Sequence, residues 1–437
     1  MGRYDAVIIG AGLAGLVTAC QLARLGQKVL LLAYGHGALL LASGCIDVLG
    51  FQPASSIEPV TDPLSKLADF LEERPDHPYR FTGRDNIEAG LTAFQALVQA
   101  QGLPYLGAAD RNWLLPSAAG AVHPTCLAPA SLANGDLSRG GRMLIVGFPE
   151  LRDFYPALIS QNLNEQALGV RAEPLLVDLP PVPISDDQNV LPVELAYVFE
   201  RPDFRRQVIQ RLKGQTRGYD RVGFPAVLGI KRHAEVMADL ESGLGKPVFE
   251  ISTLPPSVPG RRLLEALRQL LVEADGRMII GAQVVDGLIE AGRVSQIRFE
   301  SANRPKVVKA ENYILATGGI YGGGILTDAD GGIGRVWEPI FGLPVMAETN
   351  RHRWFAPRFL EPTGQPFANF GVRVNQQLNP VDENKRPVAE NLYLAGGVIA
   401  GADWTRGRTG DGVALATAAA IVKQITGRIY ADGASAG

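Results

Sequence analysis

Residues 4–15 read Tyr-Asp-Ala-Val-Ile-Ile-Gly-Ala-Gly-Leu-Ala-Gly, a short apolar run followed by three spaced glycines. The run predicts a buried strand over 4–9, the apolar residues of 13–25 predict a helix, and 29–33 predicts a second strand. In such a unit the first glycine permits a tight turn, the second lets a pyrophosphate approach the backbone, and the third allows close helix–strand packing. We therefore expect an α/β, Rossmann-like fold that binds a nucleotide or a flavin, the alternative being a purely structural turn. The candidate cofactor contacts of this first turn are Gly10, Gly12, Leu13, Ala14 and Gly15.

The second strand lacks the residue that ordinarily binds the adenosine part of a dinucleotide. An Asp or Glu is expected about 20 residues beyond the glycines, where it hydrogen-bonds the ribose. This chain has Leu32-Ala33-Tyr34-Gly35 at that place, and the next acidic residue is Asp47. The departure disfavours NAD and FAD alike, and it leaves room for a smaller nucleotide such as FMN.

Two later glycine pairs distinguish a flavin protein from a nicotinamide dehydrogenase. One follows an apolar run and ends the stretch 313–319, and the other ends the stretch 391–397. Together with the first turn they are typical of two-dinucleotide-motif flavoproteins, although helix caps and turns are the structural alternative. A glycine-rich loop then precedes a helix predicted over 414–425, whose N-terminus would point at the flavin. The further candidate contacts are Thr317, Gly318, Gly319, Gly396, Gly397, Gly410, Gly412 and Val413.

The segment after the second strand supplies two more candidates. Ser43 and Gly44 lie where flavoproteins of this layout place backbone against the isoalloxazine ring. Cys45 follows them, and a free cysteine is more often a small buried apolar residue than a redox group. We therefore include Ser43 and Gly44 among the cofactor contacts and give Cys45 no redox role.

The candidate catalytic residues are two arginines, and neither is a general base. Arg406 and Arg408 lie in the loop just before the last helix, and arginine binds phosphate or carboxylate through two hydrogen bonds. A second basic cluster, Arg351-His352-Arg353 with Arg358, is interpreted as solvated surface charge rather than an anion clamp. The five histidines show no metal-ligand spacing and no neighbouring carboxylate pattern, so no metal site is predicted and the general base stays unknown.

Composition excludes several classes of protein. The 437 residues carry 42 Lys and Arg against 45 Asp and Glu, a net charge of −3, which is too balanced for a nucleic-acid-binding domain. Three separated cysteines form no CxxC pair, so this chain cannot assemble an iron–sulfur cluster, and a reducing cytoplasm suits them. No run reaches the ~20 apolar residues that span a bilayer. We expect a cytoplasmic oxidoreductase that reaches a membrane only through a partner.

Alternating helix and strand patterns predict a discontinuous flavin domain with inserted segments. We assign its first part to 1–50, its second to 253–340 and its last to 385–437. A mixed α+β segment with a hairpin near 113–125 occupies 51–139, a small α/β unit with its own parallel sheet occupies 140–252, and a substrate or cap segment occupies 341–384.

Several segments together resemble the B subunit of anaerobic glycerol-3-phosphate dehydrogenase. The likeness includes the first glycine turn, Ser43-Gly44 with Asp47, and the stretch 410–413. The most specific segment is 253–263, Thr-Leu-Pro-Pro-Ser-Val-Pro-Gly-Arg-Arg-Leu, which a generic flavin domain gives no reason to expect. The loop 405–412 is more charged than the resemblance leads us to expect.

The resemblance implies an oxidoreductase subunit that takes part in oxidising sn-glycerol 3-phosphate to dihydroxyacetone phosphate and passes electrons to quinone. It implies FMN as cofactor, with FAD as the alternative. It also implies two partners, a catalytic flavoprotein subunit and an iron–sulfur subunit, which would place the chain at the inner membrane. Two other functions stay open: an unrelated flavin oxidoreductase of the fumarate reductase kind, and a noncatalytic structural or electron-relay subunit.

Overall fold

Five parallel strands form the first sheet of the computed structural model, which describes residues 3–53, 55–181, 190–302, 304–328 and 334–430. Its strand order is β11-β2-β1-β15-β20. The strands are β1 (Tyr4–Ile9), β2 (Val29–Ala33), β11 (Arg277–Ile280), β15 (Ala310–Leu315) and β20 (Leu392–Leu394). Three distant parts of the chain therefore build one sheet, and the carboxyl ends of all five strands lie at the same edge.

Four helices pack around this sheet: α1 (Leu13–Arg24), α3 (Tyr79–Gln99), α9 (Val258–Glu273) and α11 (Gly410–Thr426). Helix α1 contacts β1 and β2 as well as α9 and α11, and α11 also packs along α3. Their apolar faces and the strands form one large buried core. An antiparallel meander of β12 (Ala282–Glu290), β13 (Arg293–Ser301) and β14 (Arg304–Val308) leads from β11 to β15.

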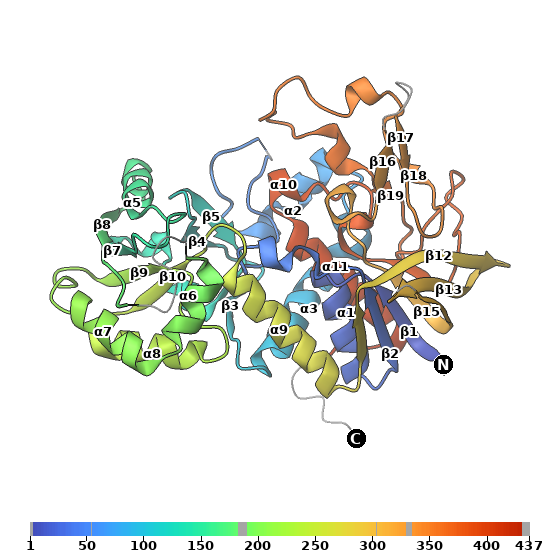
Figure 1. Cartoon of the computed structure of the whole chain (residues 1–437). Helices are drawn as coiled ribbons and strands as arrows, with labels where there is room; N and C mark the ends of the chain where they lie inside the picture. The colour runs from blue at the N-terminus through green and yellow to red at the C-terminus, as the bar shows by residue number, and fades with distance from the viewer. Residues whose placement is uncertain (1–2, 54, 182–189, 303, 329–333, 431–437) are drawn as a thin grey trace.

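A second parallel sheet, β10-β9-β7-β8, has its own core and lies beside the first (Figure 1). Its strands are β7 (Gly141–Gly147), β8 (Val170–Leu176), β9 (Arg221–Pro225) and β10 (Val248–Ile251). The helices α5 (Pro156–Glu165), α6 (Pro192–Phe199), α7 (Pro202–Leu212) and α8 (His233–Leu244) belong to this unit. Figure 1 shows α9 running between the two sheets.

Short elements complete the described chain. The helices are α2 (Pro63–Glu73), α4 (Ala130–Ala133) and α10 (Trp404–Gly407), with 3₁₀ turns at Gly37–Leu41, Leu137–Arg139, Ile320–Gly322, Arg351–Arg353, Pro366–Asn369 and Gly396–Val398. The two-stranded pairs are β3 (Tyr105–Gly107) with β6 (Leu127–Pro129), β4 (Trp113–Pro116) with β5 (Val122–Thr125), β16 (Leu326–Asp328) with β17 (Arg335–Trp337), and β18 (Val345–Met346) with β19 (Gly371–Val372). Within the described ranges no helix combines the length and apolar character that crossing a membrane requires.

The elements follow the sequence pattern closely, with two shifts in the second sheet. The sequence pattern of 151–168 predicts a helix over that range, but α5 begins only at Pro156, because residues 148–155 form turns that bury Phe148, Leu151 and Phe154. The pattern of 175–178 predicts a strand there, whereas β8 lies earlier, at Val170–Leu176, and pairs with β7 along its whole length. Strand β10 is absent from the sequence-based expectation, and it is buried on both faces as a strand of a parallel sheet often is.

Candidate functional site

Of the three glycines in the first turn, two are tightly packed against main-chain atoms and one faces open space. A Cβ on Gly10, where φ is +115°, would lie 2.2 Å from the Ala316 carbonyl oxygen. A Cβ on Gly15 would lie 2.0 Å from the Gly10 carbonyl oxygen, whereas a Cβ on Gly12 would meet nothing within 4 Å. Helix α1 begins after Gly12 with no side-chain cap and no acidic residue in its first turn. Its first N–H groups are therefore free to bind an anion.

The second and third glycine turns lie beside the first, at the carboxyl edge of the sheet. Main-chain hydrogen bonds join the strand ends, since Ala316 N–H donates to Ile9 and Ala395 N–H donates to Leu315. A Cβ on Gly319 would lie 2.7 Å from the Gly397 carbonyl oxygen, and one on Gly396 would lie 3.0 Å from the Ala14 Cβ. The structure therefore brings together the candidates of 10–15, 317–319 and 396–397.

One polar side chain at this edge has no partner among the described residues. The Thr317 hydroxyl is buried at its oxygen and makes no hydrogen bond with them. Buried hydroxyls in folded proteins are nearly always hydrogen-bonded, so an unpaired one indicates a missing ligand or water. The unpaired hydroxyl, the open Gly12 and the uncapped α1 are the features that a bound phosphate-bearing nucleotide would complete.

The start of α11 lies next to the segment that follows β2. Gly412 N–H donates to the Asp47 carbonyl oxygen at 2.9 Å, and a Cβ on Gly412 would lie 2.0 Å from the Tyr79 hydroxyl. Val413 is buried. Gly412 and Val413 thus face the protein, and only the partly exposed Gly410 and the backbone of the first helical turn can face a ligand.

Ser43 and Gly44 form a turn against the start of α9. The Ser43 hydroxyl accepts a hydrogen bond from Cys45 N–H at 3.2 Å. Gly44 has φ +85°, and a Cβ there would lie 2.5 Å from the Pro259 Cβ. Ser43 is half-buried and Gly44 is buried, so of this pair Ser43 is the residue that can touch a ligand.

Four titratable residues meet where this segment, the β4–β5 hairpin and α11 come together. His123 Nε2 lies 2.8 Å from Asp47 Oδ2, and Arg408 Nη1 lies 3.4 Å from the same oxygen. Asp47 N–H donates to Asp411 Oδ2 at 3.3 Å. Asp47 and His123 are buried, whereas Arg408 and Asp411 keep part of their surface. We call Asp47, His123, Arg408 and Asp411 the acid–base cluster.

The surroundings shift the pKa values of the cluster's two carboxyls in opposite directions. Burial acts to raise the pKa of Asp47, but the charge and hydrogen bond of His123, together with Arg408, lower it below the usual value. Burial and the negative charge of Asp47 raise the pKa of Asp411 to about 7. One carboxyl is therefore held ionised and the other is held near its protonated state, a pattern that is typical of acid–base sites.

The sequence points to only half of this cluster. Arg408 is a catalytic candidate there, and Asp47 stands out only as an acidic residue far from its expected place. His123 is one of five histidines that the sequence marks for no site. Nothing local marks His123, because its carboxylate partner lies 76 residues away. The hairpin predicted near 113–125 is the one sequence feature that could have pointed to His123. In the structure His123 pairs with Leu115 on this hairpin, and the pairing determines the face of the hairpin from which the imidazole projects.

The other candidates lie outside the cluster. Arg406 is half-buried beside Gly364 and makes no hydrogen bond or ion pair with any described residue. The basic cluster is exposed, with Arg351, His352 and Arg353 on their 3₁₀ turn and Arg358 on the loop that follows. Ala33 ends β2 buried and Tyr34 is 77% exposed, so no carboxylate stands at the end of this strand. Among the described residues no three His, Cys, Asp or Glu side chains could hold a metal ion.

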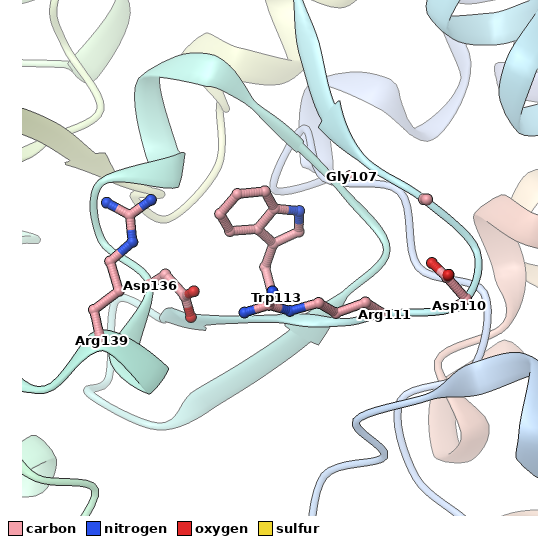
Figure 2. A pocket seen from close by; sticks show the side chains of 7 residues that line it. Gly107, Asp110, Arg111, Trp113, Asp136 and Arg139 are labelled. Carbon is pink, nitrogen blue, oxygen red and sulfur yellow. The ribbon is translucent and has the colours of Figure 1, made fainter.

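A separate cavity of about 450 Å³ lies between the β3–β4 connection and the 3₁₀ turn at Leu137–Arg139. Figure 2 shows Trp113 between Arg111 and Arg139, with Asp110 and Asp136 nearby. The Asp136 carboxylate already accepts hydrogen bonds from Leu114 and Ser138. Trp113 also begins the hairpin that carries His123. None of the residues that line the cavity belongs to the three glycine turns.

Comparison with known proteins identifies the family. The model of a family described as FAD binding domain matches residues 5–413. The B subunit of anaerobic glycerol-3-phosphate dehydrogenase from Pectobacterium atrosepticum is 30% identical over 97% of this chain and 98% of its own length. A protein named as the probable B subunit of the same dehydrogenase, from Halobacterium salinarum, is 35% identical over 94% of this chain and 95% of its own.

Among solved structures, the 3-ketosteroid Δ1-dehydrogenase of Sterolibacterium denitrificans matches 98% of this chain and 100% of its own at 11% identity, with a TM-score of 0.42. The assignment rests on the family model and the relatives rather than on this likeness. The Rossmann-like flavoprotein fold and the resemblance expected from the sequence are both confirmed. The chain belongs to the FAD binding domain family and, within it, to the B subunits of anaerobic glycerol-3-phosphate dehydrogenase.

Proposed function

We propose that the chain binds a flavin along the carboxyl edge of the first sheet and serves as a flavin-dependent subunit of a glycerol-3-phosphate dehydrogenase. The convergence of three glycine turns on an uncapped helix start carries the proposal. Gly12 and the N–H groups at the start of α1 would receive the phosphate, and Thr317 would hydrogen-bond the flavin. The groups that would line the ring are Ser43, Gly319, Gly397, Gly410 and the first turn of α11.

Between the two common flavins, FMN and FAD, the proposed cofactor is FMN. Family membership supports a flavin and favours FAD. The end of β2 favours the shorter nucleotide, because Ala33 and the exposed Tyr34 offer no carboxylate to an adenosine ribose. The mass of the flavin released from the purified protein decides between the two, and FAD would contradict the argument from Ala33.

The reaction proposed is the oxidation of sn-glycerol 3-phosphate to dihydroxyacetone phosphate, with electrons passed on to quinone. Bound flavin supplies a two-electron acceptor for the hydride of an alcohol carbon. The glycine turns would hold the flavin, and the positive end of α11 would then favour negative charge on it. Arg408, whose side chain is 39% exposed, offers a guanidinium to an anionic substrate at the mouth of the acid–base cluster.

Partner subunits and position in the cell are proposed from the family. The relatives are named as one subunit of a dehydrogenase, so other subunits accompany them. We propose a catalytic flavoprotein subunit and an iron–sulfur subunit as partners, which would hold this chain at the inner face of a membrane. The domain division is proposed as well, with 1–50, 253–340 and 385–437 forming the flavin domain.

The experiment is an anaerobic titration of the purified, flavin-loaded protein followed by absorbance. The expected result is a flavin spectrum that bleaches when glycerol 3-phosphate is added. Bleaching only when the partner flavoprotein is also present would instead favour an electron-relay subunit. Reoxidation of the reduced protein by fumarate, with no response to glycerol 3-phosphate, would favour a fumarate reductase-like enzyme, and a protein that binds no flavin would contradict the proposal.

A further inference from the structure

We propose that Asp411 is the proton-holding group of the flavin site and that Asp47 is the positioning residue that keeps the proton there. The inference rests on the proposed flavin site and extends it, because nothing in the family assignment gives these two residues a role. Asp411 lies in the first turn of α11, a helix that packs against α1 and against the Gly396–Val398 turn.

The geometry fixes Asp47 as the ionised member of the pair. Its two carboxylate oxygens lie 2.8 and 2.9 Å from His123 Nε2, and Oδ2 also lies 3.4 Å from an Arg408 nitrogen. Two cationic or donor groups thus face one buried carboxylate, which stabilises its charged form. The main chain of Asp47 makes two hydrogen bonds to the start of α11. Its N–H donates to the Asp411 carboxyl, and its carbonyl oxygen accepts from Gly412 N–H.

Asp411 has the opposite surroundings. It accepts one hydrogen bond, from a neutral main-chain N–H, and the negative charge of Asp47 acts on it strongly. The start of a helix normally favours a carboxylate, and Arg408 acts in the same direction. Burial and Asp47 prevail over these two effects, and they raise the pKa of Asp411 to about 7.

Three other titratable groups near Asp411 cannot take over this role. Tyr79, Tyr105 and Cys45 all face the cluster, and burial raises the pKa of each well above its usual value. These groups therefore stay neutral across the physiological range. Asp411 is the group among them that changes charge near neutral pH.

The proton equilibrium follows from charge balance. A flavin bound at the proposed site would gain negative charge near the start of α11 when it accepts two electrons, either from an alcohol substrate or from dithionite in a test. That charge disfavours the Asp411 carboxylate further, so Asp411 takes up a proton from solvent as the electrons arrive. The site thus couples electron uptake to proton uptake, with at most one proton on Asp411 for each two electrons.

The first test uses the flavin-free protein, so that its result does not depend on whether the proposed flavin site is correct. Infrared difference spectra between pH 5 and pH 9 record the C=O stretch of a protonated carboxyl. We expect a band that titrates near neutral pH, that is lost in Asp411→Asn, and that titrates at lower pH in Asp47→Asn. A band unchanged in either variant would overturn the proposal.

Glu338 provides the matched control for this measurement. It is a second buried carboxyl whose pKa is raised by burial, and it lies outside the cluster, where it accepts hydrogen bonds from Ile340 and Phe341. Glu338→Gln should remove only its own infrared signal and leave the band of Asp411 in place. If Glu338→Gln abolished the neutral band, the assignment to Asp411 would be wrong.

The second test measures the flavin midpoint potential against pH in the loaded protein. Uptake of one further proton for each two electrons steepens the slope by about 30 mV per pH unit. We expect the wild type to show a steeper slope above pH 7 than Asp411→Asn. Equal slopes in the two proteins would overturn the coupling, even if the infrared band were present.

Discussion

The ion pair between Arg262 and Glu250 should decide how firmly the second sheet is attached to the flavin domain. Arg262 lies on α9, and Glu250 lies on β10 of the second sheet. Their two hydrogen bonds measure 2.6 and 2.9 Å, and both side chains are buried. Arg262 also donates to the Gly229 carbonyl oxygen at 2.8 Å. Replacing Arg262 with Met would therefore leave a buried carboxylate without its cation.

The pKa of Glu250 and the general cost of breaking a buried ion pair give the same magnitude. Burial acts to raise the pKa of Glu250, yet the charge and hydrogen bonds of Arg262 hold it at about 2 instead of 4.5. At about 1.4 kcal/mol for each pH unit, this difference corresponds to about 3 kcal/mol. Removing one partner of a buried pair typically costs about 3–5 kcal/mol, whereas replacing both with apolar residues is often neutral. We expect Arg262→Met to lose about 3–4 kcal/mol and the double variant with Glu250→Leu to lose much less.

Hydrogen exchange of the β9 and β10 amides measures this local stability directly. The pH dependence provides a second check. Because the folded pKa of Glu250 is lowered, its stabilising contribution is present above about pH 4.5 and is lost as the pH falls toward 2. The gap between the wild type and Arg262→Met should therefore narrow in acid. A loss below about 1 kcal/mol, or a double variant as unstable as the single one, would refute the reasoning.

Three further predictions concern the glycine turn, the thiols and the acid–base cluster. Gly15→Ala should destabilise the fold by several kcal/mol, because its Cβ would lie 2.0 Å from a main-chain oxygen of the first turn. Urea unfolding measures the loss, with Gly214→Ala as the control variant whose Cβ meets no atom within 4 Å. Iodoacetamide at pH 8 should leave Cys20, Cys45 and Cys126 unmodified in the native protein, because burial raises the pKa of all three thiols. Mass spectrometry should find them alkylated only after unfolding. Stability should fall as the pH rises from about 4 to 7, because the raised pKa of Asp411 makes the folded state bind a proton that the unfolded state has lost; thermal unfolding of Asp411→Asn should lack this contribution.

The first sheet could be predicted because its signals are local. The strand at 4–9, the glycine spacing and the helix that follows occupy one continuous stretch, and the two later glycine pairs each mark a strand end. The segment 253–263 could be recognised but not explained from the sequence. In the structure Ser257 caps α9, a Cβ on Gly260 would lie 1.9 Å from the Leu39 carbonyl oxygen, and Arg262 pairs with Glu250.

The acid–base cluster could not be predicted, because it depends on long-range pairing. Asp47, His123 and Asp411 come from three separate parts of the chain, and each looks ordinary among its sequence neighbours. Only the folded hairpin and the start of α11 bring them together. Sequence patterns therefore located the edge of the sheet where the flavin is proposed to bind, but not the charges beside it.

The central claim is that a flavin occupies the open face of the first glycine turn, and Gly12→Val tests it most directly. A Cβ at Gly12 meets no atom within 4 Å, so the variant should fold, but it would fill the space where the phosphate is proposed to bind. Gly214→Val is the matched control, since Gly214 is equally open and lies in the second unit. We predict that the flavin bound per chain, measured by absorbance after purification, falls at least tenfold in Gly12→Val and stays unchanged in Gly214→Val. A folded Gly12→Val protein that retains its full flavin content would contradict the account.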